Sequence, residues 1–178
     1  VVGWSGSNLK ILAVGTLKAV KDFSTLLIAF SLIPSNLNAR LLILGEGESR
    51  VALESLVQQL GIEQKVFMPG FVKDPTPFYQ QADLFVMTST AEGFGNVVVE
   101  ALAVGLPVVS TDCPSGPREI LEDGKYGKLV PVGDSKALAL AMVKSLAAEH
   151  NAAALIERAQ DFSINKAAEK YINILFGS

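Results

Sequence analysis

The chain has 178 residues, of which 49% are hydrophobic, and this length and composition predict one compact domain with a buried core. Fifteen Lys and Arg residues against eighteen Asp and Glu residues give a net charge of -3. No basic run is interleaved with aromatic residues, so nucleic acid is not an expected partner. The single cysteine, Cys113, excludes an internal disulfide, and together with the single histidine, His150, it excludes a Cys/His zinc cluster. This cysteine usage favours a reducing, cytoplasmic setting.

The N-terminal residues lack the charged start and apolar core of a secretory signal. We interpret residues 1–9 as a lead-in or linker and residues 10–178 as one domain. No uncharged apolar stretch reaches the ~18 to 20 residues that span a bilayer, which predicts a soluble protein. The net charge argues only weakly against a membrane surface.

Apolar runs and helical periodicities alternate along the chain. Strands this continuously apolar are typical of a parallel sheet that is buried on both faces. The predicted strands cover residues 11–15, 41–45, 66–68, 84–89, 107–111 and 128–130. The predicted helices cover residues 23–30, 53–60, 76–81, 96–104, 135–147 and 164–176. This alternation predicts an α/β fold with a doubly wound, Rossmann-like parallel sheet, whose ligands bind beyond the carboxyl ends of the strands.

Residues 90–96 follow a predicted buried strand and open a helix, which suits binding of an anion such as a diphosphate. Gly93 and Gly95 let a ligand approach the backbone closely. Glu92 lies in this loop and Glu100 lies eight residues later in the helix, so the two carboxylates can grip two parts of one extended ligand, such as a hexose and a ribose. The alternative is that Glu92 stabilises the helix end electrostatically and Glu100 is solvated.

The segment Glu92-Gly93-Phe94-Gly95, followed by Glu-Ala-Leu-Ala-Val-Gly-Leu-Pro-Val-Val at residues 100–109, resembles the E-x7-E motif of retaining glycosyltransferases of the GT-B fold, in particular family 4 (group 1). The resemblance extends over about residues 10–176, and this part of the chain is similar to the C-terminal, donor-binding domain of those enzymes. It implies that Glu92 contacts hydroxyls of the transferred sugar, Glu100 the ribose, and the backbone amides of Phe94, Gly95 and Asn96 the diphosphate. Phe94 either packs the loop or lines the sugar pocket.

The turn from Gly15 to Asp22 is similar to the family's G-R-L-x3-K segment, in which Arg and Lys bind the donor diphosphate. Lys21 matches the Lys, whereas Thr16 stands where the Arg is expected. Thr supplies a neutral hydroxyl instead of a forked cation, so weaker donor binding is expected unless Lys18 compensates. The resemblance thus makes Glu92 and Lys21 the candidate catalytic residues and adds Gly15 and Thr16 to the donor-binding set.

Residues 69–72 resemble the family's G-x-V turn, which lies next to the nucleotide base, and this adds Val72 and, less strongly, Phe71 to the candidates. Both are otherwise interpreted as core residues. Residues 116–120 resemble the family's loop and short helix bordering the donor pocket. There Arg118 either supplies positive charge or forms a helix pair with Glu122. Cys113 is interpreted as a small buried hydrophobic residue and His150 as structural.

The chain has no D-x-D motif, so we expect no metal and no other cofactor, and the Asn96 helix end together with Lys21 would bind the donor. The resemblance implies a nucleoside-diphosphate sugar as substrate and an N-terminal acceptor-binding domain as partner, through which the parent chain can also associate with a membrane. The chain alone is therefore expected to bind its donor weakly and to transfer little. A GT-B-like nucleotide-sugar epimerase and a non-catalytic nucleotide-sensing module are the alternatives.

Overall fold

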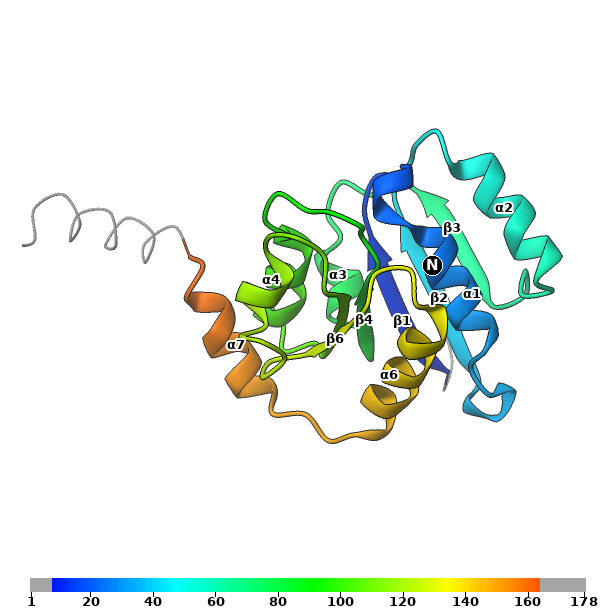
Figure 1. The fold of residues 1–178 in the computed structure, drawn as a ribbon. Helices are drawn as coiled ribbons and strands as arrows, with labels where there is room; N and C mark the ends of the chain where they lie inside the picture. Colours follow the sequence, from blue (N-terminus) through cyan, green and yellow to red (C-terminus); the bar gives the residue numbers. More distant parts are fainter. Residues whose placement is uncertain (1–7, 164–178) are drawn as a thin grey trace, which may run out of the picture.

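A computed structural model describes residues 8–163, in which a six-stranded, wholly parallel sheet is covered by helices on both faces (Figure 1). The strands are β1 (Leu9–Val14), β2 (Ala39–Leu44), β3 (Val66–Gly70), β4 (Leu84–Met87), β5 (Val108–Thr111) and β6 (Lys128–Val130). Their order in the sheet is β3-β2-β1-β4-β5-β6, so the direction of winding reverses between β1 and β4. The predicted doubly wound sheet is confirmed, and its switch point is where such folds bind ligands.

The helices follow the predicted segments closely. They are α1 (Phe23–Ser31), α2 (Arg50–Gln59), α3 (Thr76–Tyr79), α4 (Asn96–Ala103), α5 (Pro117–Ile120), α6 (Ser135–Ala147) and α7 (Ala152–Gln160), with two 3-10 turns, η1 (Ala19–Lys21) and η2 (Ser35–Leu37). Helix α7 was not predicted, because Leu155 and Ile156 are its only large apolar residues and it buries only Leu155 and Ala159. The helix predicted over residues 164–176 lies outside the described residues.

The core has two layers, one on each face of the sheet. Along β1, Ile11 and Ala13 face the layer under α1, α2 and α6, whereas Leu12 faces the layer under α3, α4 and α7. All three side chains are fully buried. A strand covered by helices on both faces needs apolar residues at every position, which explains the unbroken apolar runs in the sequence.

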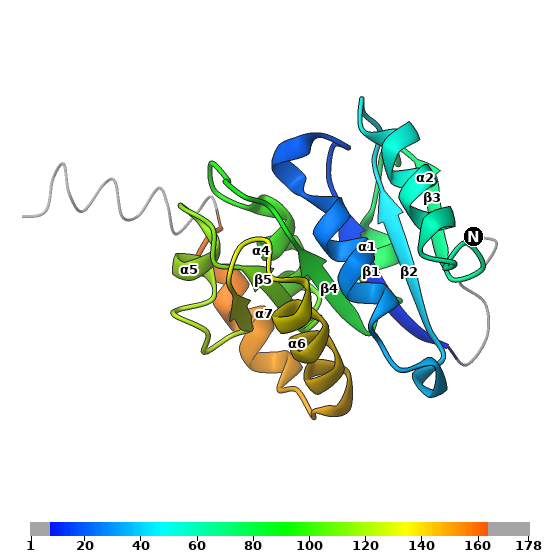
Figure 2. The ribbon, with the colours of Figure 1, turned by 45° about the vertical axis from the view of Figure 1, so that its right-hand side comes forward.

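The loops after β1, β2 and β3 are tied together at the carboxyl ends of these strands, the upper edge in Figure 2. The amide of Gly15 donates to Leu44 O at 3.0 Å, and the amide of Gly45 donates to Gly70 O at 2.9 Å. A Cβ atom at Gly45, whose φ is +150°, would lie 1.9 Å from Gly15 O. Only glycine allows this approach, so these loops pack closely together. We call the whole edge of the sheet at the carboxyl ends of its strands the rim.

The longest helix among residues 8–163 is α6, with 13 residues. Within this described part of the chain no helix is both long and apolar enough to cross a membrane.

Candidate functional site

The loops after β1 and β4 meet at the switch point of the sheet. The hydroxyl of Thr88, at the end of β4, donates to Lys21 O at 2.8 Å, and the amide of Thr90 donates to Val20 O at 2.8 Å. Because β1 and β4 are neighbours in the sheet, these bonds fix η1 against the loop that precedes α4. Lys21 and Glu92, far apart in the sequence, are thereby brought to one place.

Glu92 accepts two short hydrogen bonds through a single carboxylate oxygen. Lys21 Nζ and Ser89 Oγ each lie 2.5 Å from Glu92 Oε1. The Lys21 side chain is 22% exposed and that of Glu92 11%, so solvent screens this ion pair only partly. The Lys21 ammonium can bind a phosphate, and the adjacent Glu92 carboxylate can accept hydrogen bonds from sugar hydroxyls.

The N-terminus of α4 lies directly after this cluster. Gly95 is the N-cap residue with φ +96°, a conformation that favours glycine, and no side chain caps the helix. Among residues 8–163, no acceptor for the amides of Phe94, Gly95 and Asn96 is found. A Cβ atom at Gly93 would meet nothing within 4 Å. The helix end thus presents open amides and a positive dipole, the arrangement that binds phosphate groups.

Glu100 lies in α4, about one turn beyond this open end. Its carboxylate is not simply solvated, because the hydroxyl of Tyr79 donates to Glu100 Oε2 at 2.9 Å. Tyr79 is only 2% exposed, and its ring lies 5.4 Å from that of Phe85. Burial, reinforced by the charge of Glu100, raises the pKa of the Tyr79 phenol, so this group remains a neutral donor.

A pocket of about 430 Å³ lies on the same rim, at the ends of β1, β2 and β3. Three predicted donor-binding residues line it: Gly15, Thr16 and Val72. Phe71, a weaker candidate, also lines it and is 75% exposed, which contradicts its interpretation as a core residue. Thr16 and Lys18 are both exposed. The predicted residues thus form two clusters, this pocket and the Lys21–Glu92 site, on one edge of the sheet.

Arg118 does not form a helix pair with Glu122, which was one of its two interpretations. Its guanidinium group forms a forked contact with Asp112 and a second ion pair with Asp123, at 3.2 Å, while Glu122 pairs with Lys125. The hydrogen bonds to Asp112 raise the pKa of Arg118. Arg118 lines a pocket of about 690 Å³ on the rim, but two carboxylates offset its charge there.

Phe94 packs the loop, as one of its two interpretations predicted. Its ring lies 5.6 Å from that of Phe162 in an edge-to-face arrangement, and Arg158 lies over Phe162 at 4.7 Å. Phe94 retains 37% exposure, so one side of the ring remains accessible on the rim. A Cβ atom at Gly116, whose φ is +87°, would lie 1.6 Å from Phe94 O, so the loop before α4 rests on Gly116.

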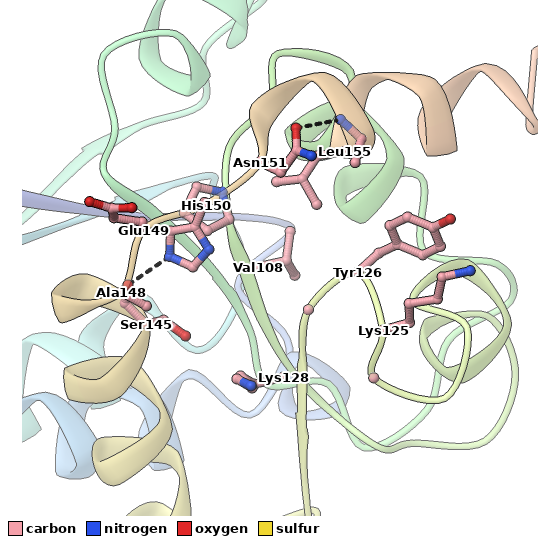
Figure 3. Close-up of a pocket in the computed structure, with 14 residues that line it drawn as sticks. Val108, Lys125, Tyr126, Lys128, Ser145, Ala148, Glu149, His150, Asn151 and Leu155 are labelled. Carbon is pink, nitrogen blue, oxygen red and sulfur yellow. Dashed lines mark hydrogen bonds between the residues drawn. The ribbon is translucent and has the colours of Figure 1, made fainter.

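Cys113 and His150 take structural positions. Cys113 is 3% exposed, and burial, followed by the charge of Glu92, raises the pKa of its thiol. His150 Nε2 lies 2.7 Å from Ser145 O beside a pocket of about 440 Å³ (Figure 3). Val108 and Lys128, which begin β5 and β6, line this pocket, so it lies at the opposite edge from the rim.

Sequence reasoning did not single out Ser89 and Tyr79, which hold the two glutamates. Ser89 had one usable signal, because it is a small polar residue at the end of a predicted strand. The sequence carries no such signal for Tyr79, since its partner Glu100 is 21 positions away on another helix. Within residues 8–163, no group of three or more His, Cys, Asp or Glu side chains could hold a metal ion.

Solved structures define the class of the domain. The chain superposes on the lipopolysaccharide outer core galactosyltransferase WaaB in its apo form with a TM-score of 0.87 and 25% identity, covering 96% of this chain and 49% of WaaB. It superposes on Anabaena HepE in complex with UDP with a TM-score of 0.83 and 26% identity, covering 94% of this chain and 48% of HepE. The fold is therefore the Rossmann-like α/β domain found in GT-B glycosyltransferases.

The sequence specifies the family within this class. Residues 2–162 match the family model described as glycosyl transferases group 1, and the chain belongs to that family. It is 34% identical over 170 residues to the lipopolysaccharide core biosynthesis glycosyltransferase LpsE of Rhizobium meliloti, which covers 93% of this chain and 49% of LpsE. It is 28% identical to the N-acetyl-alpha-D-glucosaminyl L-malate synthase of Bacillus anthracis, covering 98% of this chain and 47% of that enzyme. The chain spans about half the length of these relatives.

Proposed function

We propose that this chain is the donor-binding half of a retaining, family 4 glycosyltransferase, and that it binds a nucleoside-diphosphate sugar. The observation that carries the proposal is the Lys21–Glu92 ion pair, 2.5 Å long, next to the open N-terminus of α4. Fixed cations and backbone amides at one point can stabilise a diphosphate leaving group, which is the main electrostatic demand of glycosyl transfer. The complex of the similar HepE with UDP supports a nucleotide ligand.

Each part of the donor has a matching group on the rim. The amides of Phe94, Gly95 and Asn96 and the ammonium of Lys21 would bind the diphosphate. The carboxylate of Glu92 would accept hydroxyls of the sugar, and that of Glu100 hydroxyls of the ribose. The 430 Å³ pocket lined by Gly15, Thr16 and Val72 would hold the base.

The proposed transfer uses no metal ion and no cofactor, because Lys21 and the α4 amides would supply the positive charge that the leaving group needs. Acceptor-binding groups would come from an N-terminal domain of the parent chain, since the relatives are about twice as long as this chain. The chain alone would bind its donor weakly and transfer little. Its proposed location is the cytoplasm, with peripheral membrane contact made through the N-terminal domain.

The test compares the full natural chain with its Glu92→Ala variant and with Glu157→Ala, which changes an exposed glutamate on α7. Calorimetry with UDP, GDP and ADP should show binding of at least one nucleotide. Sugar transfer from the matching nucleotide sugar should be lost in Glu92→Ala and retained in Glu157→Ala. Nucleotide binding without transfer would favour a sensing module, and conversion of the nucleotide sugar into its epimer would favour an epimerase. Absence of any nucleotide binding would refute the proposal.

A further inference from the structure

Glu100 is anchored on one side and accessible on the other. It is exposed on α4, yet its Oε2 accepts the Tyr79 hydroxyl at 2.9 Å. No other hydrogen bond or ion pair of the Glu100 carboxylate is found among residues 8–163. Its second oxygen, Oε1, is therefore available to a ligand.

Tyr79 is itself held rigidly. It ends α3 and is 2% exposed, and its amide donates to Pro75 O at 3.2 Å. Its ring packs against Phe85 of β4 within the core layer that also contains Val98 and Leu102 of α4. The hydroxyl group thus occupies a position fixed by the core.

An exposed glutamate samples many rotamers, and ordering such a side chain on binding reduces affinity. A buried hydroxyl group requires a hydrogen-bond partner, so Tyr79 and Glu100 select one rotamer of the glutamate before any ligand arrives. Burial raises the pKa of the phenol, so the hydroxyl stays a donor to the carboxylate throughout the neutral pH range.

We propose that Tyr79 is a positioning residue that presets the Glu100 carboxylate for the ribose hydroxyls of the nucleotide. The inference rests on the proposed function, because it assigns the ribose to Glu100. Tyr79 itself touches no substrate. It acts by leaving Glu100 Oε1 in a fixed position and by removing the cost of ordering the side chain when the donor binds.

The experiment measures dissociation constants for the full natural chain with the nucleoside diphosphate that binds tightest among UDP, GDP and ADP. The same measurements use the 2′,3′-dideoxy analogue of that nucleotide. Tyr79→Phe removes only the hydroxyl, and its ring can still pack against Phe85. Tyr126→Phe is the matched control, since Tyr126 lies in the loop between α5 and β6.

We expect Tyr79→Phe to weaken binding of the ribonucleotide about threefold to tenfold, the cost of ordering one flexible side chain. Binding of the dideoxy analogue should change less than twofold, and so should both ligands with Tyr126→Phe. In a Glu100→Ala background, Tyr79→Phe should have no further effect. A purely structural role for Tyr79 would weaken both nucleotides equally and would overturn the inference.

The two hypotheses fail in different ways. If no nucleotide binds the unmodified chain, the proposed function falls and this inference falls with it. If nucleotide binds and Glu100→Ala weakens it, but Tyr79→Phe leaves the ribonucleotide affinity unchanged, only the role of Tyr79 is refuted.

Discussion

Lys21 and Glu92 stand 71 positions apart in the sequence and form an ion pair with 2.5 Å between Nζ and Oε1. In the proposed site the two groups have different targets, phosphate oxygens for the ammonium and sugar hydroxyls for the carboxylate. A bound donor therefore competes with the ion pair itself. Loss of the Glu92 carboxylate should then strengthen nucleotide binding and weaken sugar transfer.

Replacing Glu92 by Gln should strengthen binding of a free nucleoside diphosphate while it reduces sugar transfer. The variant breaks the partly buried ion pair of Lys21. Such an ion pair contributes about 1 kcal/mol, which corresponds to roughly fivefold in nucleotide affinity. Lys21→Ala should weaken the same ligand about tenfold to a hundredfold, because a hydrogen bond to a charged group is lost. Calorimetry on the full natural chain checks both values. Weaker nucleotide binding by Glu92→Gln would show that the ion pair does not compete with the phosphate.

Thr16 stands where the family resemblance predicts an Arg that binds the diphosphate, and that cation can be introduced. Thr16 is exposed and lines the 430 Å³ pocket beside Gly15. Thr16→Arg should tighten binding of the nucleoside diphosphate about threefold to tenfold, because the guanidinium group can form forked hydrogen bonds with phosphate. Asn36→Arg adds the same charge on η2, away from the rim, and should leave affinity within twofold. Equal gains from both variants would indicate a general charge effect.

The sequence predicts the sheet well because burial on both faces leaves an unambiguous apolar pattern in each central strand. Among the helices the match is closest for α6, where the predicted range 135–147 agrees with Ser135–Ala147. There Asp134 caps the helix by accepting from the amide of Ala137 at 2.9 Å, and this signal is local. Asn151 caps α7 in the same way, but only two large apolar residues follow it, Leu155 and Ile156, and α7 was missed.

The site was predictable only as far as its motif extends along the chain. The segment from Glu92 to Glu100 and its position on the rim could be inferred from the strand-loop-helix pattern. The role of Tyr79 could not, because its contact with Glu100 joins two helices 21 positions apart, whereas Ser89, three positions before Glu92, had a local signal that was not used. The same limit applies to Arg118, for which a helix pair with Glu122 was one of two interpretations. Helical spacing suggested Glu122, whereas the chain path after β5 places Asp112 within reach.

Gly116 should be far less tolerant of substitution than Gly124, although both have positive φ angles. A Cβ atom at Gly116 would lie 1.6 Å from Phe94 O, whereas at Gly124 it would meet only Gly127 O, at 3.7 Å. Gly116→Ala should lower the free energy of unfolding by about 3 kcal/mol or more, because backbone strain adds to displacement of the Phe94 loop. Gly124→Ala should lower it by about 1 to 2 kcal/mol, from strain alone. Urea denaturation measures both, and equal losses would contradict the contact with Phe94.

Cys113 should react slowly with thiol reagents, and Glu92 should contribute to that protection. Its thiol is 3% exposed, and burial and then the negative charge of Glu92 raise its pKa. Because the pKa is higher in the folded chain, the neutral thiol favours the folded state below the ordinary thiol pKa. This contribution is lost as pH rises through the raised value.

The rate of alkylation of Cys113 by iodoacetamide should therefore rise at higher pH for the folded chain than for the chain in urea. In Glu92→Gln the rise should shift to lower pH, whereas in Glu157→Gln, which changes an exposed glutamate on α7, it should not move. An identical pH profile in folded and unfolded protein would refute the raised pKa.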